Sequence, residues 1–290
     1  MNLYLNNQID TSLSTNESII SLKINSSKKD ETLYVEEYQE EILYNLFLEE
    51  KNLKIKPKYG YMKNQKSINI QMRAILIDWL IEVQYKEKFK IETLYQSIWI
   101  IDSYLSLKEM EISKFQLLGV SALLISCKCN EIYYPKLEEF IQITDNAYKK
   151  CELLEMEKEV LKILDFEIAS PTSIQFYQII SKIFKFDEKQ DYFGKFFLES
   201  SLIEYEMISF SPSLIAISSV YIVMKYFKID NYKYLYRINP YIDYEFAQNL
   251  IKELARKLCF LVENLSKSNL RSIILKYSSE EYLEVAKYCD

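Results

Sequence analysis

The chain has 290 residues, of which 49% are hydrophobic, and a formal net charge of −6 at neutral pH. This length is enough for two compact units of roughly 100–150 residues each. Three glycines and five prolines are too few for the many turns of an all-β protein, so the composition favours helices. The acidic balance argues against a nucleic-acid-binding role, for which a basic face is expected.

The residue types also exclude most kinds of enzyme. Because the sequence has no histidine, it holds no Ser-His-Asp triad, no Cys-His pair and no H-E-x-x-H metal site. Gly60, Gly119 and Gly194 lie too far apart for a phosphate-binding or dinucleotide-binding loop. Carboxylate and lysine chemistry remain open, although no paired-carboxylate motif stands out among the 42 acidic residues. We therefore expect no catalytic activity, no bound metal and no cofactor.

The cysteines and the apolar segments favour a soluble, intracellular chain. The five cysteines are odd in number and contain no C-x-x-C pair, which is typical of reduced thiols. No window of about 18 uncharged apolar residues is present, and the first residues do not resemble a signal peptide. We expect no association with a membrane.

The N-terminal part is predicted to contain a single helix. Residues 1–33 are rich in Asn, Ser, Thr and Lys without a hydrophobic period, and we expect them to form a disordered tail. Residues 34–49 then carry apolar side chains at helical spacing, as an amphipathic helix does. A lysine-rich linker follows, up to about residue 70.

The stretch 72–83, MRAILIDWLIEV, is apolar on two faces. One helical stripe consists of apolar residues three or four positions apart: Met72, Ile75, Leu76, Trp79 and Val83. The helix is either surrounded by protein, or has one face in the core and another that docks an apolar segment. Arg73 and Asp78 complicate full burial, since a buried charge must be paired.

Four further helices are predicted in the first half. The hydrophobic period places them at residues 92–107, 114–128, 138–144 and 150–166. Small side chains such as Gly119 and Ala122 would let neighbouring helices approach the second of these closely, which indicates a central position. Ser170 and Pro171 end this unit.

The second half repeats the first. Residues 117–128, LLGVSALLISCK, align with residues 214–225, LIAISSVYIVMK, at a shift of 97 positions, with the same alternation of small and large side chains. Further helices are expected at residues 173–184, 193–209, 213–227 and 244–265. The repeat predicts two copies of one helical fold.

Five motifs in this order give the chain a resemblance to the cyclin family: MRAILIDWLIEV, KFQLLGVSALLISCKCNEIYYP, ITDNAY, LEMEKEVLKILDFEI and FSPSLIA. Within that family, the chain is most similar to the mitotic B-type and A-type members. The resemblance implies an all-α protein with two tandem five-helix cyclin folds, at residues 71–168 and 169–290. An N-terminal helix and linker would precede them at residues 34–70.

The resemblance also implies a function. Members of the family bind a cyclin-dependent protein kinase as a heterodimer and activate it, which for this chain points to cell-division control at G2/M, in the nucleus and cytoplasm. The cyclin itself supplies no catalytic group, in keeping with the residue types above. The alternative is a cyclin-fold adaptor in transcription that does not activate a kinase.

The resemblance assigns a set of residues to kinase binding. Lys128 and Glu157 match a charged pair that hydrogen-bonds to the kinase backbone; an intramolecular salt bridge is the alternative, and both roles can coexist. The other implied contacts are Cys129, Glu131, Ile132, Leu161 and Phe166. Cys129 and Asn130 stand where the family usually has an aromatic residue and an acid, and loss of the ring is expected to reduce contact area.

A buried pair and a docking patch are implied as well. Arg73 and Asp102 match a structural pair inside the first fold. The patch that binds Arg-x-Leu segments of substrates and inhibitors corresponds to Met72, Ile75, Leu76, Trp79, Glu82, Phe115 and Gln116. Its apolar groove would take the leucine, and Glu82 would attract the arginine. Phe115 replaces a usual leucine, and the segment ahead of Arg73 has no arginine, hence no R-x-x-L destruction box.

Overall fold

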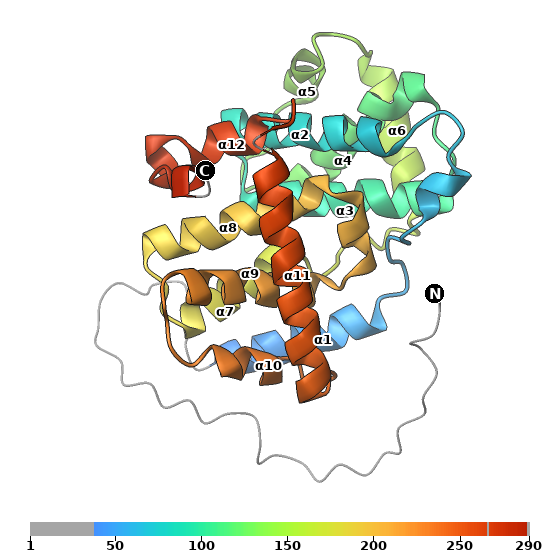
Figure 1. Cartoon of the computed structure of the whole chain (residues 1–290). Helices are drawn as coiled ribbons and strands as arrows, with labels where there is room; N and C mark the ends of the chain where they lie inside the picture. Colours follow the sequence, from blue (N-terminus) through green and yellow to red (C-terminus); the bar gives the residue numbers. More distant parts are fainter. Residues whose placement is uncertain (1–37, 266, 289–290) are drawn as a thin grey trace. The chain divides into compact units, whose positions relative to one another are not determined.

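All regular structure in the described part of the chain, residues 38–265 and 267–288 of a computed structural model, is helical, with no strand (Figure 1). The predicted all-α class is therefore confirmed over these residues. The predicted tail and the first residues of the predicted helix 34–49 lie outside them. The short 3-10 helices are η2 (Tyr61–Asn64), η3 (Ile112–Lys114), η4 (Tyr205–Ser209), η5 (Tyr232–Tyr234), η6 (Glu280–Tyr282) and η7 (Val285–Tyr288).

Helix α1 (Gln39–Asn52) attaches to the second half of the chain. Its buried Phe47 packs on Phe176, with ring centroids 5.0 Å apart. The carboxylate of Glu50 accepts hydrogen bonds from the backbone N–H and the hydroxyl of Ser213, at 2.8 and 2.6 Å. Glu50 thereby satisfies a free N–H group at the start of a second-half helix.

The first half consists of five helices: α2 (Ile70–Glu87), α3 (Ile91–Leu107), α4 (Phe115–Asn130), α5 (Leu137–Ile143) and α6 (Lys150–Ile163). Helix α4 is central, as predicted, and packs against α2, α3 and α6. A Cβ atom at Gly119 would lie 2.8 Å from Cδ1 of Leu76, so the glycine permits the close approach of α2. The segment Ile112–Asn130 is long and apolar enough to cross a membrane, but 67% of it is buried inside the fold, as in a core helix.

The second half consists of α7 (Ser173–Ile183), α8 (Glu188–Ile203), α9 (Pro212–Tyr226), α10 (Leu235–Ile238) and α11 (Tyr244–Leu265), followed by α12 (Ser272–Tyr277). Helix α9 packs against α7, α8 and α11, which gives it the central place that α4 has in the first half. Ser211 caps α9 and Pro212 occupies its first turn. The sequence repeat of residues 117–128 and 214–225 thus lies on α4 and α9, which occupy equivalent positions in the two halves.

Two predicted helices have wrong boundaries. The helix predicted at 193–209 begins earlier, because Asp187 and Gln190 form a capping box, and it ends at Ile203, before a separate 3-10 helix. Helix α6 ends at Ile163 rather than at Phe166, since Asp165 and Phe166 adopt positive φ angles of 49° and 59°. Hydrophobic spacing alone predicts neither the capping box nor the positive φ angles.

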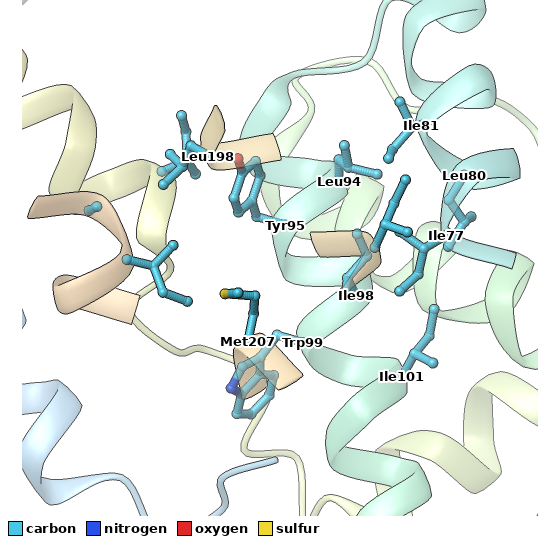
Figure 2. Packing of buried hydrophobic residues seen from close by; sticks show 14 of the residues in the cluster. Ile77, Leu80, Ile81, Leu94, Tyr95, Ile98, Trp99, Ile101, Leu198 and Met207 are labelled. Atoms are coloured by element: carbon cyan, nitrogen blue, oxygen red, sulfur yellow. The ribbon is translucent and has the colours of Figure 1, made fainter. Parts of the chain in front are cut away.

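The two halves share a core. Figure 2 shows Tyr95 and Trp99 on the side of α3 that faces Leu198 of α8 and Met207 of η4. On the other side of α3, its aliphatic residues meet Ile77 and the neighbouring apolar residues of α2 (Figure 2). Helix α2 therefore belongs to the first core but also lies beside α8 and α12.

Candidate protein-binding surfaces

Arg73 is the buried charge of α2, and it is fully paired. Its Nε and Nη2 atoms each lie 2.7 Å from an oxygen of Asp102 on α3, and the Tyr61 hydroxyl donates to the same carboxylate at 2.8 Å. Its Nη1 donates to the carbonyls of Leu202 and Ile203, at the end of α8. Burial lowers the pKa of Arg73, but the attraction of Asp102 outweighs it and the net direction is upward. This pair joins the halves.

Asp78, the second charge in α2, has a partner that the sequence analysis did not identify. Its carboxylate accepts from the backbone N–H and the hydroxyl of Ser272, at 3.1 and 2.8 Å. Burial raises the pKa of Asp78, and the hydrogen bonds from Ser272 oppose that shift. The partner helix α12 has six residues, too few for a hydrophobic period to reveal it.

A second buried ion pair was also missed. Nζ of Lys276 on α12 lies 2.8 and 2.9 Å from the two carboxylate oxygens of Glu199 on α8, and 2.8 Å from the side-chain oxygen of Gln84 on α2. The Tyr277 hydroxyl donates to Glu199 at 2.9 Å. Nothing in the sequence distinguishes these two charges from the many others. The pair fixes α12 against both halves.

The α4–α6 surface holds the residues assigned to kinase binding: Lys128, Cys129, Glu131, Ile132, Glu157, Leu161 and Phe166. Nζ of Lys128 lies 2.5 Å from Oε1 of Glu157, so the intramolecular salt bridge is formed. The Lys128 side chain remains 36% exposed and that of Glu157 13%. Both polar groups therefore reach solvent while they bind each other.

Large apolar side chains are exposed on the same surface. Ile132 is 79% exposed and Phe166 68%, while Leu161 is half-buried. The positive φ of Phe166 turns the chain at the end of α6. Tyr133, which the sequence analysis did not single out, is 93% exposed beside Ile132. A soluble protein rarely leaves several large apolar groups together in water unless they serve a partner.

Glu131 and its neighbour Asn130 form hydrogen bonds within the chain. Glu131 accepts from the backbone N–H of Lys90 and from the hydroxyl of Thr93, at 2.8 and 2.6 Å, which closes the first turn of α3. The Asn130 amide donates to Gln96 at 2.5 Å. Cys129 is exposed. Of the assigned residues, Glu131 therefore has the most evident role within the fold.

The α2 surface holds the docking residues Met72, Ile75, Leu76, Trp79, Glu82, Phe115 and Gln116. Ile75 is 60% exposed, and Met72, Trp79, Glu82 and Gln116 are half-buried. Leu76 and Phe115 are each only 6% exposed, so they line the base of this surface rather than an outward stripe. Glu82 forms a salt bridge with Lys86 at 2.5 Å.

Within the described part of the chain, no group of three or more cysteines and carboxylates is placed to hold a metal ion. Cys127, Cys129, Cys151 and Cys259 are free thiols. Burial raises the pKa of Cys127 to about 12, so this thiol is unreactive at neutral pH.

Models of two protein domains match the chain. The cyclin N-terminal domain matches residues 41–169 and the cyclin C-terminal domain matches residues 171–290. The chain belongs to the cyclin family. This membership confirms the resemblance and the predicted tandem cyclin folds.

Curated relatives of this cyclin are mitotic B-type members. It is 35% identical to a G2/mitotic-specific cyclin-B of Hydra vulgaris, over 78% of this chain and 62% of that protein. It is 37% identical to Cyclin-B2-1 of Arabidopsis thaliana, over 78% of this chain and 52% of that protein. This cyclin thus spans between about half and three fifths of the length of these relatives.

A solved structure shares the fold. The X-ray structure of a viral cyclin from herpesvirus saimiri superimposes with a TM-score of 0.66 at 18% identity, covering 76% of this cyclin and 97% of that chain. At this identity the likeness supports the fold alone.

Proposed function

We propose that this cyclin is a regulatory subunit that binds a cyclin-dependent protein kinase through the α4–α6 surface and activates it in G2/M control. The observation that carries the proposal is the Lys128–Glu157 pair, which joins α4 to α6, together with exposed Ile132 and Phe166, which follow the ends of these two helices. Membership of the cyclin family and the mitotic B-type relatives support it.

The chemistry of the α4–α6 surface suits a helix and its adjoining backbone on a partner. Lys128 has three N–H donors and Glu157 has two acceptor oxygens, so each retains hydrogen-bonding capacity after they bind each other. Ile132 and Phe166 supply the apolar contact area that a stable interface needs at its centre. The salt bridge then holds both polar groups in place ahead of binding.

Activation would come from positioning rather than from catalysis by the cyclin. A protein kinase needs its C-helix glutamate paired with the lysine that contacts ATP and its activation loop ordered. A rigid surface that packs against the C-helix stabilises that arrangement. The proposed site of action is the nucleus and cytoplasm.

The α2 surface is proposed to recruit substrates or inhibitors that contain Arg-x-Leu. Met72 and Trp79 border a base formed by Leu76 and Phe115, which gives an apolar seat for the leucine. Glu82 offers a carboxylate for the arginine, in competition with Lys86.

The test is a pull-down from extract of the source cells, followed by kinase assays. We expect a protein kinase to co-purify and the purified pair to phosphorylate a protein substrate. The variant Lys128→Ala/Glu157→Ala should lose most of this stimulation. Recovery of no kinase, together with no effect of the double variant on any kinase activity, would rule the proposal out. Binding to DNA or a polymerase without kinase stimulation would favour the transcription adaptor instead.

A further inference from the structure

Helix α2 lies between α4 on one side and α12 on the other. Leu76 contacts Gly119 of α4, whereas Asp78 holds Ser272 of α12. These two residues are two positions apart, so they point roughly 200° apart around the helix axis. The solvent-facing strip of α2 is therefore bordered by α4 along one edge and by α12 along the other.

The docking residues of α2 are spread across this strip. Ile75 and Glu82 lie three positions before and four positions after Asp78, so they share its α12 side. Trp79 and Met72 lie closer to the α4 side, with Leu76. An Arg-x-Leu segment with its leucine near α4 and its arginine at Glu82 thus runs toward α12.

Leu275 of α12 stands at the end of that path. Its side chain is 67% exposed, which is close to the 60% exposure of Ile75 on α2. Ser272 and Lys276 point from α12 toward α2, and Leu275 lies roughly 60° from Ser272 around the α12 axis, away from buried Tyr277. Leu275 therefore borders the outer, solvent side of the contact between α12 and α2.

We propose that the docking surface continues across α2 onto α12, and that it binds a peptide with an apolar residue ahead of its Arg-x-Leu core. The apolar residue packs on Leu275, and the arginine lies at Glu82, which is level with Leu275 because Ser272 contacts Asp78 and Lys276 contacts Gln84. The arginine precedes the leucine in the motif, so the residues that reach α12 are those on the N-terminal side. An extended peptide advances about 3.3 Å per residue, so two positions cover most of the distance between neighbouring helices.

Charge and rigidity support this occupant. Glu82 gives the α12 side of the strip a partly exposed carboxylate, which complements an arginine with apolar neighbours. Lys276 fixes α12 through Glu199 and Gln84, all three of them buried. Leu275 thus lies on a helix that is held in place, so little conformational entropy of α12 is lost when a peptide binds. This inference rests on the proposed docking role of the α2 surface.

Two synthetic peptides test it against the whole chain. One has an Arg-x-Leu core between glycines and serines, and the other adds a leucine two positions before the arginine. We expect the extended peptide to bind roughly three- to tenfold more tightly, as for burial of part of a leucine. Leu275→Ala should abolish the gain and leave binding of the minimal peptide unchanged. Phe260→Ala, a change at a side chain of equal 67% exposure on α11, is the matched control and should have no effect.

A charge exchange gives a second, independent measurement. In Leu275→Glu, the extended peptide with lysine in place of its added leucine should bind more tightly than the leucine version. The inference is overturned if the added leucine gives no gain, or if the gain survives Leu275→Ala, while the minimal peptide still binds and responds to Trp79→Ala. If neither peptide binds, the docking role of the α2 surface fails together with this extension.

Discussion

Two ion pairs in the first half of the molecule, Arg73–Asp102 and Lys128–Glu157, have opposite surroundings. Arg73 and Asp102 have side chains that are only 2% and 5% exposed, between α2, α3 and the end of α8. Lys128 and Glu157 lie on the α4–α6 surface beside exposed Ile132 and Phe166. Both pairs were assigned through the cyclin resemblance, yet their settings give them different physical consequences. A buried pair is costly to break, whereas an exposed pair adds little stability and remains available to a partner.

The largest effect is expected at the buried pair. Asp102→Ala leaves the Arg73 guanidinium buried without its carboxylate, and an arginine does not release its proton. We expect the free energy of unfolding to fall by about 3–5 kcal/mol, measured by urea denaturation. The double variant Arg73→Met/Asp102→Leu should cost less than Asp102→Ala, because no charge is stranded. A loss below about 1 kcal/mol for Asp102→Ala would show that the pair is not isolated from water.

The buried Lys276–Glu199 pair of the second half differs from Arg73–Asp102, because a lysine can become neutral whereas an arginine stays charged. Glu199→Gln strands Lys276, and we expect a loss of about 3 kcal/mol at pH 6. The stranded lysine can fold as a neutral amine, so the unfolded state binds more protons than the folded state. The free energy of unfolding should then rise with pH, by at most about 1.4 kcal/mol per unit.

Asp102→Ala is the control for this pH dependence, because Arg73 stays charged throughout. Urea midpoints of both variants, measured between pH 6 and pH 9 against the unchanged chain, separate the two cases. Parallel pH curves for the two variants would contradict the account of Lys276.

The two tryptophans extend the contrast between interior and surface. Trp79→Ala removes a half-buried side chain of the α2 surface, and affinity for an Arg-x-Leu peptide should fall at least about tenfold, as at an interface hot spot. Kinase binding should stay unchanged. Trp99→Ala, at a buried core position, should instead lower stability by about 3–5 kcal/mol. Equal loss of peptide and kinase binding in Trp79→Ala would place this tryptophan in the core.

The smallest stability effect is expected at the exposed pair. Lys128→Ala/Glu157→Ala should change the free energy of unfolding by less than about 1 kcal/mol, since the lysine reaches solvent and removal of both partners strands no charge. Urea denaturation of the double variant and of each single variant measures this. A loss near that of Asp102→Ala would mean that the pair is structural.

Local spacing predicted the long helices well and the polar contacts poorly. The predicted helix at 244–265 coincides with α11, because its apolar residues recur along one face over 22 residues. The short α12 and its contacts with Asp78 and Glu199 were missed, since they join positions far apart in the chain. The Arg73–Asp102 pairing came from family resemblance, and the hydrophobic period of α2 did not reveal it.

The site assignments show a similar division. Resemblance named Leu76 and Phe115 among the docking residues, but only the structure places both at the base of the surface. It assigned Glu131 to the kinase, and the structure adds that this carboxylate accepts hydrogen bonds from Lys90 and Thr93 within the chain. Burial and partner choice depend on tertiary packing, which a single sequence does not contain.

We propose that the Lys128–Glu157 pair on the α4–α6 surface binds a kinase. The most direct measurement is the affinity of the purified kinase partner for the unchanged chain and for Lys128→Ala/Glu157→Ala, with unfolding midpoints determined in parallel. We expect the complex of the double variant to be at least about tenfold weaker, at an almost unchanged unfolding midpoint. Unchanged kinase affinity in the double variant would contradict it.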